Sequence, residues 1–274
     1  MTTSKKGNNR KKLFIALMAM FVVIATIFIT LVFKTGDGLK NEGDAKTTTR
    51  TQNEEIIHTD EVTVTVNSQE MKVEVPEELN EIFSENGFTA EKLEETECKQ
   101  LVLVDSTEDE PIVRFFEVEE NRWSENRECS GFVLIGRNGV TENKREGDGC
   151  TPLGFHKIGS AFYVDEKVET KLSCFKITED SYWVDDPDSV HYNKYVEGTE
   201  AKDWNSAEHM IEYNGYRYGF VLDYNMECIP GAGSAIFFHI GSNPTAGCIA
   251  TNEELLLKYL SLLDKDKNPY VLVV

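Results

Sequence analysis

The sequence predicts a mainly β domain with short helices, preceded by a single transmembrane helix and a polar stalk. Three observations support this prediction. Short apolar runs separated by turn-rich segments fill the second half of the chain, a spacing typical of β domains. An unbroken apolar run covers residues 13–33. Polar residues from Lys34 to about Glu55 contain almost no large apolar side chain and cannot bury enough surface to fold.

The run from Leu13 to Phe33 carries no charge and has the length of a membrane-spanning helix, roughly 20 residues. Basic residues precede it and no acid does, so the positive-inside rule leaves the N-terminus in the cytoplasm. We therefore expect a single-pass protein of the cell membrane with its main domain on the extracytoplasmic side. A cleaved signal peptide is the alternative, but its apolar region is usually only about 7 to 15 residues long.

Two local patterns organise the segment after the stalk. Valines alternate around Asn67-Ser68-Gln69, which predicts a β-hairpin within residues 61–75. Pro76 then stands at an allowed first-turn position for a helix over residues 77–86. These elements form either a separate unit or the leading edge of the main domain. The predicted organisation is a cytoplasmic basic tail (1–12), a transmembrane anchor (13–33), a flexible stalk (34–60), a small membrane-proximal hairpin and helix unit (61–97) and the main domain (98–274).

The main domain contains several candidate strands and one clear helix. Thr251 and Glu254 form a capping-box pattern ahead of the apolar positions within 255–263, which predicts a helix there. The candidate strands are Gln100 to Val104, Ile112 to Val118, Gly131 to Ile135, Tyr218 to Tyr224, Ala235 to Ile240 and Tyr270 to Val274.

Composition narrows the classes of ligand. The chain has 48 acidic and 28 basic residues, a formal net charge of −20, and the acids all follow the apolar run. A nucleic-acid ligand is not expected, because phosphate binding needs a basic patch.

Six cysteines are present, at positions 98, 129, 150, 174, 228 and 248. No CxxC or Cys/His ligand spacing occurs, so no metal site is predicted. An extracytoplasmic location permits disulfides. Because Cys98 and Cys129 each lead into an apolar run, with a hairpin between them, we expect these two residues to lie close enough to bridge.

A histidine and a cysteine near the C-terminus are the candidates for chemistry. Strand alternation puts Ala235, Phe237 and His239 on one face, with His239 at the strand's end. Cys248 follows Gly247 and precedes the predicted helix cap, where a helix dipole favours a thiolate. A thiol, an imidazole and a glycine that permits close backbone approach together fit cysteine catalysis. The backbone around Gly247 and Cys248 is a candidate oxyanion site.

Two simpler interpretations stand beside this one. A cysteine in a six-cysteine exterior domain is commonly a disulfide partner, and a lone strand histidine is commonly structural. His209 is a further candidate for lining the cleft, and its simpler interpretation is likewise structural.

Two motifs resemble those of the L,D-transpeptidase catalytic domain, also called YkuD-type. The first runs from Ile236-Phe237-Phe238-His239-Ile240 to Thr245-Ala246-Gly247-Cys248-Ile249-Ala250. The second, Gly147-Asp148-Gly149-Cys150-Thr151-Pro152-Leu153-Gly154, is similar to the family's "GDGxTPLG" stretch. The resemblance covers roughly residues 98–274.

The resemblance implies a β-sandwich with short helices, with Cys248 as nucleophile and His239 as its proton acceptor. It implies substrate or oxyanion contacts at Thr245 and Gly247, and a backbone carbonyl near Ile240 or Gly241 as the group that orients the imidazole. It implies no cofactor.

The resemblance also implies a reaction. Cys248 would form a thioester with a peptidoglycan stem tetrapeptide, and an amine from a neighbouring stem would resolve it into a 3→3 cross-link. The chain departs from many members at Ala246, where they have a second histidine, and at Ala250, where they have an arginine. Two alternatives stay open. Water would make the protein an L,D-carboxypeptidase or cross-link hydrolase, and a disulfide at Cys248 would make it a non-enzymatic wall-binding module.

Overall fold

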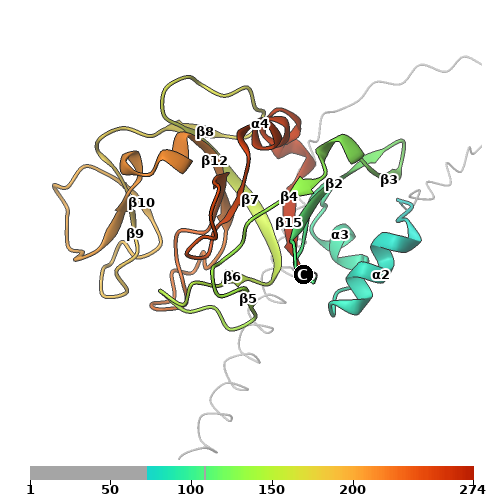
Figure 1. The fold of residues 1–274 in the computed structure, drawn as a ribbon, viewed down its shortest axis with the longest axis horizontal. Helices are drawn as coiled ribbons and strands as arrows, with labels where there is room; N and C mark the ends of the chain where they lie inside the picture. Colours follow the sequence, from blue (N-terminus) through green and yellow to red (C-terminus); the bar gives the residue numbers. More distant parts are fainter. Residues whose placement is uncertain (1–72, 108) are drawn as a thin grey trace, which may run out of the picture. The chain divides into compact units, whose positions relative to one another are not determined.

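A ten-stranded sheet dominates the part of the chain that the computed structural model describes, residues 73–107 and 109–274 (Figure 1). Its hydrogen-bonded path runs β14-β13-β12-β7-β15-β1-β2-β3, with β4 paired to β2 and β8 paired to β7. The prediction of a mainly β domain with few short helices is confirmed. The strands are β1 (Gln100–Asp105), β2 (Ile112–Glu119), β3 (Arg122–Glu125), β4 (Gly131–Phe132), β7 (Gly154–Tyr163), β8 (Cys174–Lys176), β12 (Tyr218–Asp223), β13 (Phe237–Ile240), β14 (Ile249–Thr251) and β15 (Pro269–Val273).

Two smaller sheets and several short helices complete the unit. The three-stranded sheet has the order β10-β9-β11, and β5 pairs with β6. Their strands are β5 (Val140–Thr141), β6 (Thr151–Pro152), β9 (Ser181–Val184), β10 (Tyr195–Glu197) and β11 (Ala207–His209). The helices are α2 (Glu77–Glu85), α3 (Glu91–Glu95), α4 (Glu253–Leu262) and the 3₁₀ turns η1 (Arg127–Cys129), η2 (Met210–Glu212), η3 (Asn214–Arg217) and η4 (Lys265–Lys267).

Alternation along β1 builds two layers of core. Val102 and Val104 join one apolar cluster, and Leu101 and Leu103 join another. Helix α4 covers the first face through Leu255, Leu256, Tyr259 and Leu260, all of them buried. Each such buried side chain contributes about 1.5–3 kcal/mol.

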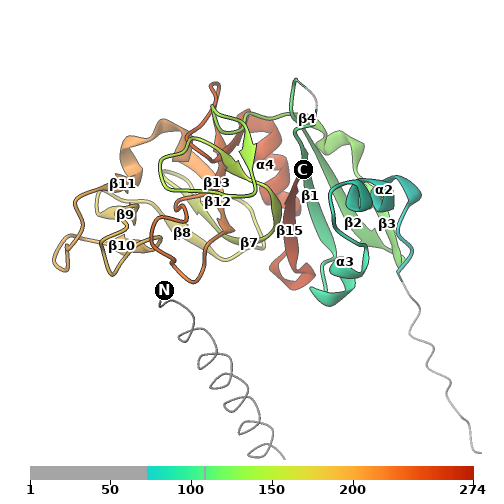
Figure 2. The ribbon, with the colours of Figure 1, turned by 90° about the horizontal axis from the view of Figure 1, so that it is seen from below.

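The opposite face of β1 is covered by α2 and α3. Leu79, Phe83 and Leu93 lie in the same cluster as Leu101 and Leu103. Figure 2 shows both helices beside β1–β3, at the opposite end of this unit from β9–β11. Helices α2 and α3 therefore share a core with the main sheet.

The helix expected over residues 77–86 is confirmed as α2, which follows Pro76 and has Glu77 and Glu78 in its first turn. Gly87 follows its end at φ +74°. Residues 61–72 of the expected hairpin lie outside the described residues, and Glu74 bridges Arg122 on β3. The tail (1–12), the anchor (13–33) and the stalk (34–60) also lie outside them. Within the described ranges, no helix is long and apolar enough to cross a membrane.

The predicted cap at Thr251 is wrong. Asn252 caps α4, since its side chain accepts a hydrogen bond from Leu255 N at 2.9 Å. Thr251 ends β14 instead, and its hydroxyl donates to Phe132 O at 3.0 Å. The strand reaches one residue further than the capping pattern indicated.

The predicted Cys98–Cys129 bridge is also wrong, since all six cysteines are free thiols. Cys98 lies in the cluster covered by α2 and α3, and its thiol donates to Gln100 O at 3.2 Å. Cys129 lies in the cluster covered by α4. The two side chains belong to opposite faces of the sheet, because β3 adds outside β2 and the chain does not return to its starting point.

Candidate active site

Parallel pairing of β13 with β14 holds Cys248 against the strand that carries His239. The register joins Phe238 to Ile249 and His239 to Ala250, and Cys248 immediately precedes β14. The N–H of Phe237 lies 3.4 Å from Cys248 Sγ, and the thiol donates to Ala235 O at 3.2 Å. The backbone beside β13 thus fixes the sulfur, which belongs to a residue only 6% exposed.

The loop before Cys248 is closed by Thr245. Its hydroxyl donates to Cys248 O at 2.6 Å and accepts the N–H of Gly247 at 3.1 Å. Gly247 has φ +154°, and a Cβ there would lie 3.0 Å from Cys150 O. The two predicted substrate-binding residues are therefore next to the thiol, where they shape its loop. The Gly247 N–H is already bonded to Thr245, so an oxyanion does not find a free donor there in this conformation.

His239 is oriented by its own neighbour in the chain. Its Nδ1 lies 2.8 Å from Ile240 O, which requires a proton on Nδ1 and leaves Nε2 as the acceptor. This is one of the two backbone carbonyls, near Ile240 or Gly241, that the family resemblance implied as the orienting group. Burial lowers the pKa of His239, although the Ile240 carbonyl opposes that shift. The imidazole is thus held neutral and ready to accept a proton.

Tyr216 contacts both residues of the pair. Its ring is 5.1 Å from the His239 imidazole in a T-shaped arrangement, and its hydroxyl is close enough to Cys248 to lower the thiol pKa. Among the described residues, no hydrogen bond joins Cys248 directly to His239. Gly215 permits this packing, because a Cβ there would clash with Ile240 O and press on His239 Nδ1.

The expectation of a thiolate at Cys248 is wrong for this structure. Burial, followed by the negative charge of Glu208, raises the thiol pKa to about 12. The residues after Cys248 continue as β14, and α4 begins only at Glu253, so its dipole does not act on the sulfur directly. In this structure Cys248 is a neutral thiol that donates to Ala235 O.

The "GDGxTPLG" segment lies against the Cys248 loop. Thr151 donates to Cys248 O at 3.2 Å, and Gly136 pairs with Thr245 in a parallel bridge. Asp148 of this segment forms an ion pair with the buried Lys144, Nζ to Oδ1 at 2.5 Å. The Lys144 side chain is 3% exposed, and its charge helps to lower the Cys248 pKa. The two motifs, far apart in sequence, thus form one site.

Sequence reasoning missed Glu208 and Tyr216. The Tyr216 hydroxyl donates to Glu208 Oε2 at 2.5 Å. Burial raises the pKa of Glu208 to about 7, and burial also raises that of Tyr216. The sequence offered one indication for Glu208: alternation along a strand places its side chain on the face opposite that of its neighbour His209.

His209 faces away from the thiol. Its Nε2 is 2.7 Å from Glu179 O and its Nδ1 is 3.0 Å from Glu212 Oε1. The ring stacks on Tyr182 at 4.6 Å. These contacts give His209 a structural role and do not bring it to the nucleophile.

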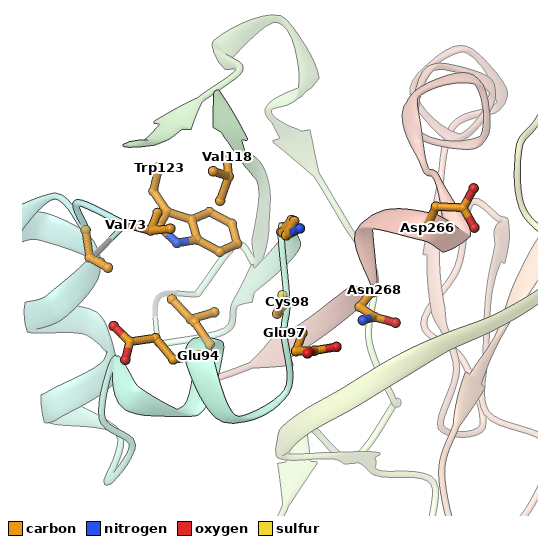
Figure 3. A pocket seen from close by; sticks show the side chains of 11 residues that line it. Val73, Glu94, Glu97, Cys98, Val118, Trp123, Asp266 and Asn268 are labelled. Atoms are coloured by element: carbon orange, nitrogen blue, oxygen red, sulfur yellow. The ribbon is translucent and has the colours of Figure 1, made fainter. Parts of the chain in front are cut away.

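A cavity of about 290 Å³ lies elsewhere, between α3, β3 and the start of β15. Trp123 and Val118 face it from the sheet, and Glu94, Glu97 and Asp266 stand around it (Figure 3). None of the predicted site residues lines it. Its thiol, Cys98, donates to Gln100 O at 3.2 Å, and burial raises the Cys98 pKa to about 12. Within residues 73–107 and 109–274, no group of three or more His, Cys, Asp or Glu side chains is arranged to hold a metal ion.

A family model matches the part of the chain that contains this geometry. The family model described as the L,D-transpeptidase catalytic domain matches residues 99–271. No curated protein matches the sequence. Among solved structures, the helical cell shape determining protein Pgp2 from Campylobacter jejuni is similar, at 18% identity and a TM-score of 0.37. That similarity covers 64% of this chain and 47% of the other, so this chain spans about half the length of that protein.

The family match includes β13, the Cys248 loop and the "GDGxTPLG" segment, and it extends over more than half of the chain. The protein therefore belongs to the L,D-transpeptidase catalytic domain family.

Proposed function

We propose that this protein is a cysteine acyltransferase that forms 3→3 cross-links between peptidoglycan stem peptides. The observation that supports this most strongly is the contact of the Cys248 thiol with β13. The sulfur lies beside Phe237, which is two residues before His239 and on the same face of that strand. Family membership supports the substrate class.

In the first half-reaction, His239 Nε2 accepts the thiol proton and the sulfur attacks the carbonyl of the third stem residue. The bond to D-alanine then breaks, the protonated imidazole gives its proton to the leaving amine, and a thioester remains on Cys248. Apo hydrogen bonds are often long in catalytic sites and shorten in the substrate complex, which suits the absence of a direct thiol–imidazole bond here.

In the second half-reaction, the amine of a neighbouring stem attacks the thioester. His239 takes the amine proton, the C–S bond breaks and the thiolate regains a proton. The Cys248 N–H, and not the Gly247 N–H that bonds to Thr245, stabilises the tetrahedral oxyanion. These steps use no metal or cofactor.

The proposal also includes the location of the reaction. Residues 13–33 hold the domain at the outer face of the cell membrane, where stem peptides are found. The support for this is the apolar run and the basic residues before it.

Incubation of the full-length chain with disaccharide tetrapeptides, followed by mass analysis, tests the reaction. Cross-linked dimers that have lost D-alanine are the expected product. Monomeric tripeptides would instead identify a carboxypeptidase, and unchanged tetrapeptides would overturn the enzyme assignment. Cys228→Ser is the matched cysteine control, because Cys228 lies outside the helices and strands and its thiol donates to Met226 O.

A further inference from the structure

We propose that Tyr216 and Glu208 position and control the nucleophile, because the Tyr216 hydroxyl turns from Glu208 to the Cys248 sulfur when Glu208 takes up a proton. This inference rests on the proposed role of Cys248 as the nucleophile. Neither residue belongs to the two motifs that carry the family resemblance.

Packing fixes the Tyr216 ring and leaves only its hydroxyl proton free to move. The residue is 4% exposed. Its ring meets Phe162, Phe237 and His239 edge-on at 5.8, 5.3 and 5.1 Å, and it stacks on Tyr213 at 5.1 Å. The phenol oxygen therefore stays between Glu208 and the thiol, whichever way its proton points.

Glu208 lies among acidic and phenolic groups. Among the described residues, no cationic side chain forms an ion pair with it, and its hydrogen bond at 2.5 Å comes from Tyr216. Asp185 adds negative charge beside Glu208. Its buried Oδ1 has no hydrogen-bond partner in the described part of the chain. The titratable groups that face Glu208 are Asp185 after β9, Glu146 just before the "GDGxTPLG" segment, Tyr213 and Tyr216 at η3, and Cys248 before β14.

These surroundings give Glu208 two accessible states near neutral pH. Burial, with Asp185 and Glu146 adding repulsion, raises its pKa to about 7, although the Tyr216 hydroxyl opposes that shift. The ionised carboxylate accepts the Tyr216 proton, and its charge raises the Cys248 pKa. The thiol is then strongly held in its neutral form.

Protonation reverses both effects. A carboxylic acid taken to neutrality by a solvent proton donates to the Tyr216 oxygen, and the Tyr216 O–H then donates to the sulfur. No proton leaves Tyr216, so the step only reorients one O–H bond. The thiolate gains a donor and loses a facing negative charge, and both changes favour ionisation of Cys248.

Alkylation of Cys248 by iodoacetamide in the full-length chain tests this arrangement without any peptidoglycan substrate. Peptide mapping by mass spectrometry reads the rate at Cys248 separately from the other cysteines. In wild type, we expect the rate to rise about tenfold per pH unit, as thiolate does, with a flattening near pH 7 where Glu208 ionises. A profile without that flattening overturns the proposal even if no variant folds.

Two substitutions are expected to act in opposite directions. Glu208→Gln removes the charge, so alkylation above pH 7 should speed up several-fold and the profile should become straight. Tyr216→Phe removes the donor, so alkylation should slow by about tenfold, the effect of one pKa unit. Tyr213→Phe is the matched control, because Tyr213 stacks on Tyr216 and is 46% exposed.

Equal slowing by Glu208→Gln and Tyr216→Phe at every pH would show a merely structural role and overturn the proposal. The proposed cross-linking reaction is judged separately, from the products formed on tetrapeptides. An enzyme that shows the expected alkylation profiles but releases no D-alanine would retain this control of the thiol and lose the proposed function.

Discussion

Thr245 bonds to Cys248 across the turn that precedes β14: its hydroxyl donates to Cys248 O at 2.6 Å and accepts Gly247 N–H at 3.1 Å. One short side chain thus organises both neighbouring peptide groups. The turn also depends on the left-handed backbone of Gly247 and on the narrow space beside Cys150 O.

Gly247→Ala should therefore abolish most activity and lower the free energy of unfolding by about 1–3 kcal/mol, the usual cost of such backbone strain. Its Cβ would lie 3.0 Å from Cys150 O and 3.3 Å from Lys144 Nζ. Gly231→Ala is the control, since Gly231 also has a positive φ, +76°, but open space around it. Urea unfolding and acylation rates compare the two. Full activity in Gly247→Ala would show that the turn tolerates a side chain.

Cys248→Ser should remove transfer activity and leave folding nearly unchanged. A hydroxyl is far less acidic and nucleophilic than a thiol at neutral pH, and it can still donate to Ala235 O. Product analysis on tetrapeptides measures the loss, and circular dichroism with the thermal midpoint checks the fold. Turnover at the wild-type rate would refute the assignment of Cys248.

His239→Ala should slow acylation of Cys248 by about 10²-fold or more, the usual contribution of a general base. His209→Ala should have a much smaller effect, because its ring contacts Glu179, Glu212 and Tyr182 instead of the thiol. Acylation by a β-lactam-like donor, followed by mass spectrometry, gives both rates. Equal rates in wild type and His239→Ala would mean that another group activates the thiol.

The pH dependence of acylation carries the same information about His239. Burial lowers its pKa from 6.5, so the neutral imidazole persists as the pH falls and loses its lone pair only below 6.5. The limb of the profile assigned to the base should therefore have its midpoint under pH 6.5 and disappear in His239→Ala.

Asp148→Asn should lower the free energy of unfolding by about 3 kcal/mol, because it leaves the buried Lys144 ammonium without its counter-charge. Lys171→Met breaks the more exposed pair with Asp264 and should cost less than about 1 kcal/mol. Denaturant titrations of both variants measure the difference. Similar losses would show that the Lys144–Asp148 pair is no more stabilising than a surface pair.

The contribution of Asp148 should also depend on pH. Burial opposes ionisation, but the Lys144 hydrogen bond and the N–H groups of Cys150 and Arg145 together lower the pKa of Asp148 below 3.8. A lowered carboxyl pKa stabilises the fold above the unfolded value, and that stabilisation is lost as the pH falls through the lowered one. Asp148→Asn should therefore flatten the acid limb of the stability curve under pH 3.8.

The strands that could be predicted from sequence are those with continuous apolar runs. Strands β1, β12 and β15 each follow a predicted run closely, since most of their residues on both faces are buried. Strand β2 also matches a predicted run, although Arg114 and Glu117 within it are only partly buried. Strand β7 was missed although it is the longest, because His156, Lys157 and Gly159 interrupt its apolar pattern. Its neighbours β12 and β15 determine its conformation, which is a tertiary effect that no local pattern contains.

The same limit applies to the site. His239 and Cys248 were predictable because a strand, a short loop and a Gly-Cys pair adjoin in sequence. Glu208 and Tyr216 come from β11 and η3, which the fold brings to the thiol through packing around Phe237. The Cys248 pKa was misjudged because the sequence shows only that a helix follows the cysteine. Burial has the largest effect on the thiol pKa, and burial depends on the folded chain.

The pairing of β1 with β15 sets the order in which the domain can be completed. Gln100 partners Pro269 and Val104 partners Val273, so this edge of β1 stays unpaired until β15 has been synthesised. A ribosome that has made everything up to β14 still leaves β1 and β7 with open edges, which are prone to pair with other chains. The nascent protein is therefore most exposed to aggregation before β15 is made, and a stop codon ahead of Pro269 would leave that state permanent.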